Sequence, residues 1–267
     1  MRSVNDQMHR TIKVVDVPKR IISLVPAQTE LLHDLGLGDR VVGVTKFCTH
    51  PEAWQRTKPL IGGTKKLNIQ QIRSLRPDLI FGNKEENTPS DIEELELEFP
   101  VWMSDVRDLE GALDMIRRVG QITATVGAAE SMARRIHDVF NEMQVPQRGL
   151  SAAYVIWRDP IMTVGHNTFI HDMLLRCGLR NAFGDCPIRY PELTANELAA
   201  AAPDIILLPS EPFPFAEQHL AEMNRICPKA TVLLVDGELF GWYGSRLLQA
   251  PAYMNGVIGG LKIELRA

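Results

Sequence analysis

The sequence predicts an α/β protein with two similar lobes, each built on a mostly parallel sheet, and a ligand cleft between the lobes. Short apolar strands alternate with helical segments in the first 105 residues, and the same alternation resumes after residue 144. An uninterrupted helical pattern lies between them. We therefore expect a first lobe at 1–107, one long connecting helix at 108–144 and a second lobe at 145–267.

The first lobe is expected to open with two strands. "TIKVVDV" at 11–17 alternates and is β-branched, and "RIISLV" at 20–25 is a nearly continuous apolar run that a proline ends. A short helix then runs to Leu35, where "GLGD" supplies glycines that accept positive φ. "VVGV" at 41–44 is the next expected strand.

The segment "LNIQQIRSLRPDLIFGN" at 67–83 predicts one complete helix and strand unit. Asn68 is the expected N-cap, Pro77 ends the helix, and "LIFG" forms a buried strand. A further unit follows in "TPSDIEELELEF" and "VWMS". This repeated order favours a parallel sheet.

The expected connecting helix has no proline between Asp108 and Gln144, and its apolar residues recur at helical spacing. Three glycines, Gly111, Gly120 and Gly127, each cost about 1 kcal/mol relative to alanine inside a helix, so a kink is compatible with the pattern.

The second half repeats the pattern of the first. "AAYVIW" and "IMTVG" are expected strands, and "LTANELAAAAPDIILLPS" repeats the order helix, proline, aspartate and strand. Pro203 and Asp204 follow Pro77 and Asp78 at the same offset, 204 − 78 = 126. Two similar lobes imply a cleft, with the loops after each strand at its mouth.

Composition excludes several classes of protein. The net charge of −4 comes from interspersed signs, so the basic stripe that nucleic-acid binding requires is missing and we expect no nucleic-acid partner. The four cysteines form no CxxC pair. No apolar run approaches the length of a membrane span, and "MRSVNDQMHRTIKVVDVPKR" lacks the apolar core of a secretory signal. We expect a cytoplasmic protein, or alternatively a periplasmic one whose leader has been removed.

Catalytic motifs are absent from the sequence. It contains no GxSxG, no HExxH, no P-loop and no complete dinucleotide fingerprint. We therefore assign no catalytic residue and expect no enzymatic activity.

Several ordered motifs together carry a family resemblance. "PKRIISLVPAQTELLHDLGLGDRVVGVT", "HPEA", "LNIQQIRSLRPDLIF", "VGHNTFIHDMLLRCGL", "RYPELTANELAAAAPDIILL" and "DGELFGWYGSR" resemble the class III periplasmic substrate-binding proteins. The similarity is greatest to the cobalamin-binding and ferric-siderophore-binding members, from about residue 11 to the C-terminus. It implies two α/β lobes on a rigid helix and a corrinoid, haem or ferric siderophore as ligand, without catalysis.

The resemblance also implies docking to an ABC permease through one surface carboxylate per lobe. Gln70 and Asn196 occupy the expected positions, and neutral amides cannot form the charge-assisted pair that a permease arginine requires. The aromatic residue expected before "LNIQQI" is replaced at Thr64, whereas its counterpart is retained as Tyr190. These departures favour a cytosolic relative detached from a transporter, for which permease docking is doubtful.

Two loops supply further candidate ligand contacts. Cys48 and His50 follow the strand "VVGV", and the resemblance aligns His50 with a ligand-contacting tyrosine. A thiolate and an imidazole also suit a divalent metal, although a stable site usually needs four ligands; an ordinary loop is the alternative. His166 follows "IMTVG" and is expected to line the cleft, or else to cap the next helix with Asn167.

Arginine and aromatic residues complete the expected ligand site. Such residues suit a flat, anionic, conjugated ligand through stacking and carboxylate pairing. The candidates are Arg189, Tyr190, Trp242, Tyr243 and Arg246. Packing of Trp242 or Tyr243 in the core is the competing interpretation. Lys65, beside Lys66, would attract an anionic ligand at the cleft mouth, or would simply be solvated.

The sequence thus predicts a small-molecule binding protein of the ABC-transporter substrate-binding type. Its expected ligand is a metal chelate, a tetrapyrrole-like molecule or a metal ion. Two alternatives remain open: a periplasmic transport receptor without its leader, and a small cytosolic enzyme of tetrapyrrole or metal-insertion chemistry.

Overall fold

The computed structural model describes residues 1–144 and 149–261, which divide into two compact units. The first unit comprises Met1–Val106, Glu110–Asp138 and Tyr243–Arg246, and the second comprises the remaining described residues. Two α/β units agree with the predicted fold class, although the boundaries differ. Most of the expected connector belongs to the first unit, as does a four-residue segment near the C-terminus. The expected boundary at 144–145 borders residues outside the described ranges.

A four-stranded parallel sheet forms the centre of the first unit, in the order β4-β3-β7-β8. Its strands are β3 (Ile21–Ser23), β4 (Val41–Val44), β7 (Leu79–Asn83) and β8 (Val101–Ser104). The helices that accompany them are α1 (Pro26–Asp34), α2 (Glu52–Thr57), α3 (Ile69–Leu75) and α4 (Pro89–Glu96). Two small antiparallel hairpins, β1 (Arg2–Asn5) with β2 (Thr11–Val14) and β5 (Gly62–Gly63) with β6 (Lys66–Leu67), complete the unit.

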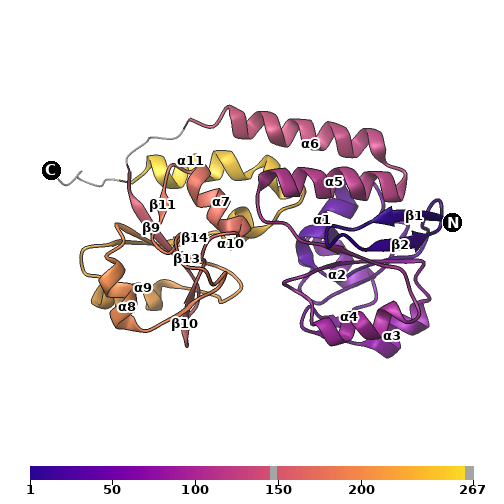
Figure 1. Ribbon diagram of the computed structural model, residues 1–267, viewed down its shortest axis with the longest axis horizontal. Coiled ribbons are helices and arrows are strands. Elements are labelled where there is room, and N and C mark those ends of the chain that lie inside the picture. Colours follow the sequence, from indigo (N-terminus) through magenta and orange to yellow (C-terminus); the bar gives the residue numbers. More distant parts are fainter. Residues whose placement is uncertain (145–148, 262–267) are drawn as a thin grey trace. The chain divides into compact units, whose positions relative to one another are not determined.

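Helices cover both faces of this sheet (Figure 1). On one face α3 and α4 bury Ile72, Ile92 and Leu95 against strand residues such as Ile80 and Met103. On the other face lie α1 and α5 (Leu109–Thr123), the latter with a continuous buried stripe of apolar side chains. Since the sheet is covered on both sides, β3, β7 and β8 are buried at every residue rather than at alternate residues.

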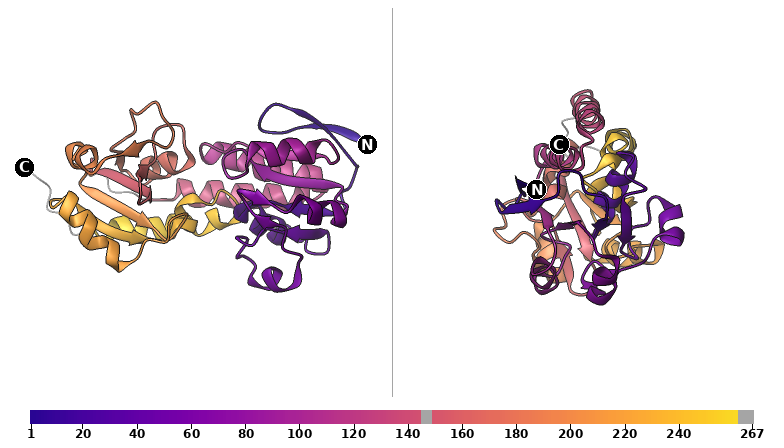
Figure 2. Two further views of the ribbon diagram at one scale, coloured as in Figure 1. Left: turned by 90° about the horizontal axis from the view of Figure 1, so that it is seen from below. Right: turned by 90° about the vertical axis from the view of Figure 1, so that its right-hand side faces the viewer.

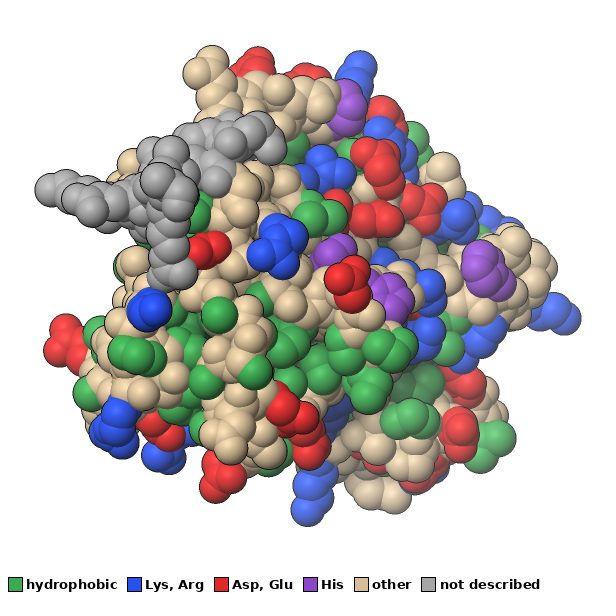
Figure 3. Space-filling view, turned by 60° about the vertical axis from the view of Figure 1, so that its left-hand side comes forward, with side chains coloured by type: hydrophobic (Ala, Val, Ile, Leu, Met, Phe, Trp, Pro, Cys, Tyr) green, Lys and Arg blue, Asp and Glu red, His purple; other side chains and the backbone are tan. Residues whose placement is uncertain are grey.

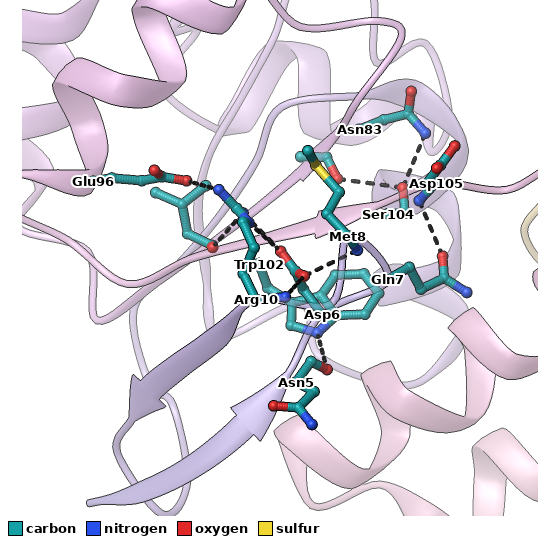
Figure 4. A network of polar contacts seen from close by, with 12 residues as sticks. Asn5, Asp6, Gln7, Met8, Arg10, Asn83, Glu96, Trp102, Ser104 and Asp105 are labelled. Atoms are coloured by element: carbon teal, nitrogen blue, oxygen red, sulfur yellow. Dashed lines mark hydrogen bonds and ion pairs between the residues drawn. The ribbon is translucent and has the colours of Figure 1, made fainter.

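The N-terminal hairpin is fastened to β8 by polar contacts that the sequence did not reveal (Figure 4). The carboxylate of Asp6, 1% exposed, accepts from the backbone N–H groups of Met8 and Arg10 and pairs with the Arg10 guanidinium at 2.7 Å. Trp102 Nε1 donates to the Asn5 carbonyl at 3.2 Å. The predicted strand at 11–17 is therefore shorter, Thr11–Val14, and its partner β1 was not predicted.

The predicted single connecting helix is wrong: the structure has two helices, α5 and α6 (Val126–Asn141). The chain turns at Ala124, whose φ is +59°. The last carbonyls of α5 accept hydrogen bonds from two arginine side chains. Arg2 donates to the carbonyls of Gln121 and Ile122, and Arg40 donates to the carbonyl of Thr123. These donors satisfy the helix end as a C-cap would.

The two helices lie side by side (Figures 1 and 2). At Gly120 an added Cβ would lie 2.3 Å from the Cβ of Ala129, so the close approach of α5 and α6 requires glycine there. The sequence pattern indicated only that Gly120 lowers the stability of a helix, whereas in the structure Gly120 allows the two helices to pack closely.

The second unit has a six-stranded mixed sheet in which β12-β10-β9-β13-β14 are adjacent and β11 also pairs with β9. Its strands are β9 (Ser151–Trp157), β10 (Ile161–Thr163), β11 (Arg180–Asn181), β12 (Glu192–Leu193), β13 (Ile205–Pro209) and β14 (Thr231–Val235). Its helices are α7 (Phe169–Arg176), α8 (Ala195–Ala201), α9 (Glu217–Ile226), α10 (Gly237–Gly241) and α11 (Ala250–Gly259). A 3₁₀ turn at Ser245–Leu248 begins in the first unit and ends in the second.

Both faces of the second sheet are also covered. On one face α8 and α9 pack Leu198 and Met223 against β9 and β13. On the other face Tyr154 of β9 contacts Phe240 of α10, which in turn contacts Tyr253 of α11. Within residues 1–144 and 149–261, none of the helices has the length and hydropathy of a membrane span.

The repeat predicted at an offset of 126 has a structural basis. Asp78 precedes β7, and its carboxylate accepts from the backbone N–H groups of Lys19 and Arg20 at 2.7 and 2.8 Å. Asp204 precedes β13, and its carboxylate accepts from the backbone N–H and the hydroxyl of Ser151, both at 2.8 Å. Each aspartate therefore fastens the start of the neighbouring parallel strand.

The helix ends before these aspartates match as well. Arg76 and Ala202 are the C-cap residues of α3 and α8, and both have φ of +44° in the left-handed region. The helix, proline, aspartate and strand order that sequence analysis noticed is thus one structural device that occurs in both units.

Candidate ligand-binding site

In the first unit, a buried polar network lies where the parallel strands end. Gln28 Nε2 donates to the Gly82 carbonyl at 3.1 Å and to Ser104 Oγ at 2.8 Å. Asn83 Nδ2 donates to the same hydroxyl at 3.0 Å (Figure 4). Gln28 Oε1 is buried and accepts no hydrogen bond from the described residues. Open α/β sheets bind ligands outside the carboxyl ends of their strands, so this edge is the candidate site of the first unit.

Tyr243 reaches this edge from the C-terminal part of the chain. Its hydroxyl donates to Glu86 Oε1 at 2.6 Å, and its side chain is buried, with 7% of the residue exposed. Burial raises the pKa of the Glu86 carboxyl above its ordinary value. Burial and the nearby Glu86 charge raise the pKa of Tyr243 well above its ordinary value. The Tyr243 hydroxyl, which was expected to contact a ligand, therefore forms an internal hydrogen bond with Glu86.

Arg246 forms a bidentate ion pair with Glu30 of α1. Its Nε and Nη2 atoms lie 2.9 and 2.7 Å from the two carboxylate oxygens, and only 11% and 13% of the two side chains are exposed. The prediction that Arg246 pairs with a ligand carboxylate did not foresee this internal partner. Together with Tyr243, the pair fastens Tyr243–Arg246 within the first unit.

Cys48 does not fit the predicted metal site. The residue is 0% exposed, its sulfur accepts from Thr29 Oγ1 at 3.0 Å, and it lies 3.2 Å from Thr45 Oγ1. Burial raises the pKa of this thiol, so the protein favours the protonated form over the thiolate that a metal requires. His50 is half-buried in the same loop. Across residues 1–144 and 149–261, no three His, Cys, Asp or Glu side chains are grouped to hold a metal ion.

Thr64 and Lys65 are held against the loop that contains Glu86. The Thr64 carbonyl accepts from Asn87 Nδ2 at 3.1 Å, and the Lys65 carbonyl accepts from Thr88 Oγ1 at 2.8 Å. The Lys65 ammonium donates to the carbonyl oxygen of Glu85. The structure therefore brings these two predicted residues to the same edge of the sheet as Tyr243, with Lys65 exposed and Thr64 half-buried.

In the second unit, His166, Arg189 and Tyr190 belong to two paired loops. The backbone N–H of Gly165 donates to the Arg189 carbonyl at 2.7 Å, and His166 Nδ1 lies 2.5 Å from the Cys186 carbonyl oxygen. His166 is exposed, whereas Arg189 and Tyr190 are half-buried. Three predicted contacts thus lie on one pair of loops.

The alternative role for His166 and Asn167 as a helix cap is wrong. Thr168 is the N-cap of α7, and its hydroxyl accepts from the backbone N–H of His171 at 3.2 Å. Asn167 instead has φ of +59°, a conformation that asparagine tolerates better than most residues.

Trp242 is buried at the carboxyl edge of the second sheet, with 5% exposed. Its indole Nε1 donates to the carboxylate of Glu211. The backbone of Gly237 approaches Glu211 so closely that an added Cβ would lie 2.8 Å from the Glu211 Cγ. The burial of Trp242 and Tyr243 favours the competing interpretation, in which these aromatic residues pack internally rather than form an open stacking platform.

Sequence analysis missed the acidic partners of its own candidates. Glu86, Glu30 and Glu211 hold Tyr243, Arg246 and Trp242 respectively. Position was a signal for Glu86 and Glu211, which follow soon after β7 and β13, whereas Glu30 lies inside α1 and had no such signal. The predicted mixing of charges is visible on the face in Figure 3, where acidic and basic side chains of the described residues lie among one another.

Two α/β units with polar loops at the carboxyl ends of their strands define a class of small-molecule binding proteins. The comparisons agree with this class. A family model described as periplasmic binding protein matches residues 21–222, and the chain belongs to this family.

Named relatives share the fold over most of the chain. A vitamin B12-binding protein of Pectobacterium carotovorum is 23% identical over 240 residues, which covers 88% of this chain and 86% of the relative. The crystal structure of the periplasmic vitamin B12 binding protein BtuF of Vibrio cholerae has a TM-score of 0.78 and 23% identity, covering 91% of this chain and 97% of that chain. The periplasmic heme-binding protein RhuT of Roseiflexus sp. RS-1 in apo form has a TM-score of 0.76 and 22% identity, covering 90% and 98%.

Proposed function

We propose that this chain binds a metal chelate or tetrapyrrole-like molecule, namely a corrinoid, a haem or a ferric siderophore, and acts by binding without catalysis. The observation that carries the proposal is the set of named relatives. One curated relative and one solved structure are named for vitamin B12, and another structure of the same fold is named for heme. Both ligands are large, flat, conjugated rings around a metal, with polar groups at the rim.

The residues of the candidate site support this ligand class. In the second unit, Tyr190 and Arg189 offer a ring for stacking and a guanidinium for a rim carboxylate, and His166 is an exposed imidazole. In the first unit, Lys65 offers an ammonium and His50 a second imidazole. The buried and protonated Cys48 offers no nucleophile, which supports binding rather than chemistry.

Titration of the purified chain with cyanocobalamin, hemin and a ferric siderophore, followed by visible absorption and calorimetry, tests the proposal. We expect saturable binding of one of these ligands, weakened by Tyr190→Ala and His166→Ala. His137→Ala on α6 is the matched control, because it removes an exposed imidazole from a helix surface. Binding of none of the three ligands would refute the proposal, and so would equal binding by all variants.

We also propose that docking to an ABC permease is weak and that the chain acts in the cytoplasm. Gln70 and Asn196 lie in the first turns of α3 and α8, and both are exposed. Neither presents a negative charge to an arginine. If the proposal is correct, the double variant Gln70→Glu/Asn196→Glu gains affinity for a permease of this transporter class in membrane vesicles. Tight docking of the unaltered chain would overturn the proposal, as would recovery of the native gene product in the periplasmic fraction.

A further inference from the structure

A pocket opens on the first unit, beside α3. Its volume is about 640 Å³, and it is lined by the turn after β4, the β5–β6 hairpin and the first residues of α3. Lys65, predicted to contact a ligand, and Gln70, at the expected permease-docking position, both contribute to it. The rest of the lining, including Lys46, Phe47 and Lys66, has no role in the proposed corrinoid or haem site.

The charge of this pocket has one sign. Its titratable lining side chains are Lys46, Lys65 and Lys66, and no carboxylate contributes to the lining. The Lys65 ammonium donates to a neutral backbone carbonyl, that of Glu85, and its charge also acts on the buried Glu86 carboxyl outside the lining. Over the described ranges 1–144 and 149–261, none of the three ammonium groups forms an ion pair with a carboxylate. Three positive charges around one hollow whose lining holds no carboxylate favour a ligand with several negative charges.

The pocket also has an apolar wall. Phe47 is 51% exposed, unusually open for its size, and the Lys46 ammonium lies 5.0 Å from the centroid of its ring. An added Cβ at Gly63 would lie 3.0 Å from the Phe47 ring, so the hairpin packs directly against this side chain. The ring is therefore held at the pocket while one part of it stays open to a ligand.

The hairpin that carries two of the lysines has a defined geometry. Gly62 has φ of +97°, and an added Cβ there would lie 2.6 Å from the Lys66 carbonyl oxygen. The β5–β6 pairing places Lys66 opposite Gly63, and the backbone N–H of Lys46 donates to the Gly62 carbonyl at 2.9 Å. Lys46 and Lys66 are thereby tied to one hairpin, which fixes their backbones around the pocket.

From these observations we infer that the pocket beside α3 binds a small organic anion that bears two or more carboxylate or phosphate groups and an aromatic part that packs on Phe47. The side-chain amide of Gln70 is compatible with this anion, whereas a carboxylate at position 70 would repel it. Gln70, which we propose to disfavour docking to a permease, thus also keeps the pocket free of negative charge. This site shares Lys65 with the proposed corrinoid or haem site, and Lys46, Phe47, Lys66 and Gln70 belong to the pocket beside α3 alone.

Calorimetric titration of the full chain with benzene-1,3,5-tricarboxylate, adenosine triphosphate and inorganic pyrophosphate tests the inference. We expect the two aromatic probes to bind more tightly than pyrophosphate and to lose affinity at high ionic strength, since exposed charge pairs are screened. The preference between the tricarboxylate and the triphosphate identifies which anionic group the site favours, and either preference supports the inference.

Two kinds of variant locate the binding. Lys46→Gln and Lys66→Gln are each expected to weaken the aromatic probes by about threefold to fivefold, as losing one partly exposed charge contact does. Gln70→Glu introduces a negative charge with little change of shape and is expected to weaken them similarly. Asn196→Glu is the matched control, because it makes a near-equivalent change in the first turn of α8 in the other unit.

The outcomes separate this inference from the proposed function. No binding of any probe would overturn the inference, and so would equal binding by Gln70→Glu and the unaltered chain. Titration of the same variants with cyanocobalamin or hemin reports on the other site, and Lys65 is left unchanged because it belongs to both. Loss of anion binding with unchanged binding of the coloured ligand supports two separate sites.

Discussion

The hydroxyl of Tyr243 donates a hydrogen bond to the carboxylate of Glu86 at 2.6 Å, although the two residues are 157 positions apart. Arg246 and Glu30 are joined in the same way over 216 positions. Both contacts lie within the first unit, so a segment near the C-terminus completes a fold that begins at the N-terminus. The first unit is therefore incomplete without residues that follow the entire second sheet in the sequence.

Removal of the Tyr243 hydroxyl is expected to destabilise the first unit. Tyr243→Phe leaves the ring in place but deprives the Glu86 carboxylate of its donor, and a hydrogen bond to a charged group contributes about 1.5–3 kcal/mol. Hydrogen exchange measured by mass spectrometry should show faster exchange in β7 and β8. The matched control is Tyr253→Phe, which removes a hydroxyl that accepts from Asp236 N–H in the second unit. Protection of β7 and β8 equal to that of the unaltered chain would contradict the prediction.

Replacement of Glu86 is expected to change how stability depends on pH. Burial raises the pKa of the carboxyl in the folded protein above the ordinary value of 4.5. The folded state thus binds this proton more tightly than the unfolded state, and the resulting stabilisation is present below pH 4.5 and is lost as the pH rises through the raised pKa. Glu86→Gln does not titrate there. Its free energy of unfolding should therefore increase relative to the unaltered chain as the pH rises from 4.5 toward neutrality.

Urea unfolding at a series of pH values measures this difference. The control is Glu93→Gln on the exposed face of α4, for which we expect a change below about 0.5 kcal/mol, as for most surface substitutions. A Glu86→Gln profile parallel to that of the unaltered chain would show that this carboxyl does not govern the pH dependence.

The helix, proline, aspartate and strand units could be predicted from sequence because their signals are local. Asn68 caps α3 by accepting from the Gln71 N–H at 3.1 Å, as expected. Asp78 and Asp204, which are 126 positions apart, form equivalent hydrogen bonds with the start of a neighbouring strand. The break between α5 and α6 could not be predicted in this way. It depends on Arg2 and Arg40, which reach the end of α5 from distant parts of the chain.

The candidate site was predictable only in part, for the same physical reason. Loops that follow strands gather at one edge of a sheet whatever their composition, so the place of His166 could be predicted from position alone, whereas Thr64 and Tyr190 were candidates through the family resemblance. Whether a side chain at that edge is open or buried depends on partners far away in sequence. Burial of Cys48 under two threonine hydroxyls is an example, since Thr29 lies 19 positions earlier.

Breaking the Arg246–Glu30 pair is expected to cost more than breaking an exposed pair of similar geometry. Arg246→Met keeps much of the side-chain volume but leaves the Glu30 carboxylate, only 13% exposed, without its partner. Loss of one member of a buried pair costs roughly 3 kcal/mol, and slight exposure reduces this somewhat. Arg56→Met removes the partner of Glu52 at a site where the side chains are 71% and 77% exposed, and should cost about 0.5 kcal/mol or less.

Urea unfolding of both variants tests this contrast. The double variant Arg246→Met/Glu30→Gln should recover part of the loss, because it no longer buries an unpaired charge. Equal small losses in Arg246→Met and Arg56→Met would mean that the pair contributes little to the first unit.

The left-handed C-cap of α8 predicts a stabilising substitution. Ala202 has φ of +44°, a conformation that costs a residue with a Cβ about 1 kcal/mol and costs glycine almost nothing. Ala202→Gly should therefore raise the free energy of unfolding, although the greater freedom of glycine in the unfolded chain offsets part of the gain. Ala200→Gly is the matched control: it is equally exposed but lies inside α8, where glycine costs about 1 kcal/mol. Thermal unfolding of the two variants should shift Tm in opposite directions, and a fall in both would show that the Ala202 backbone carries no such strain.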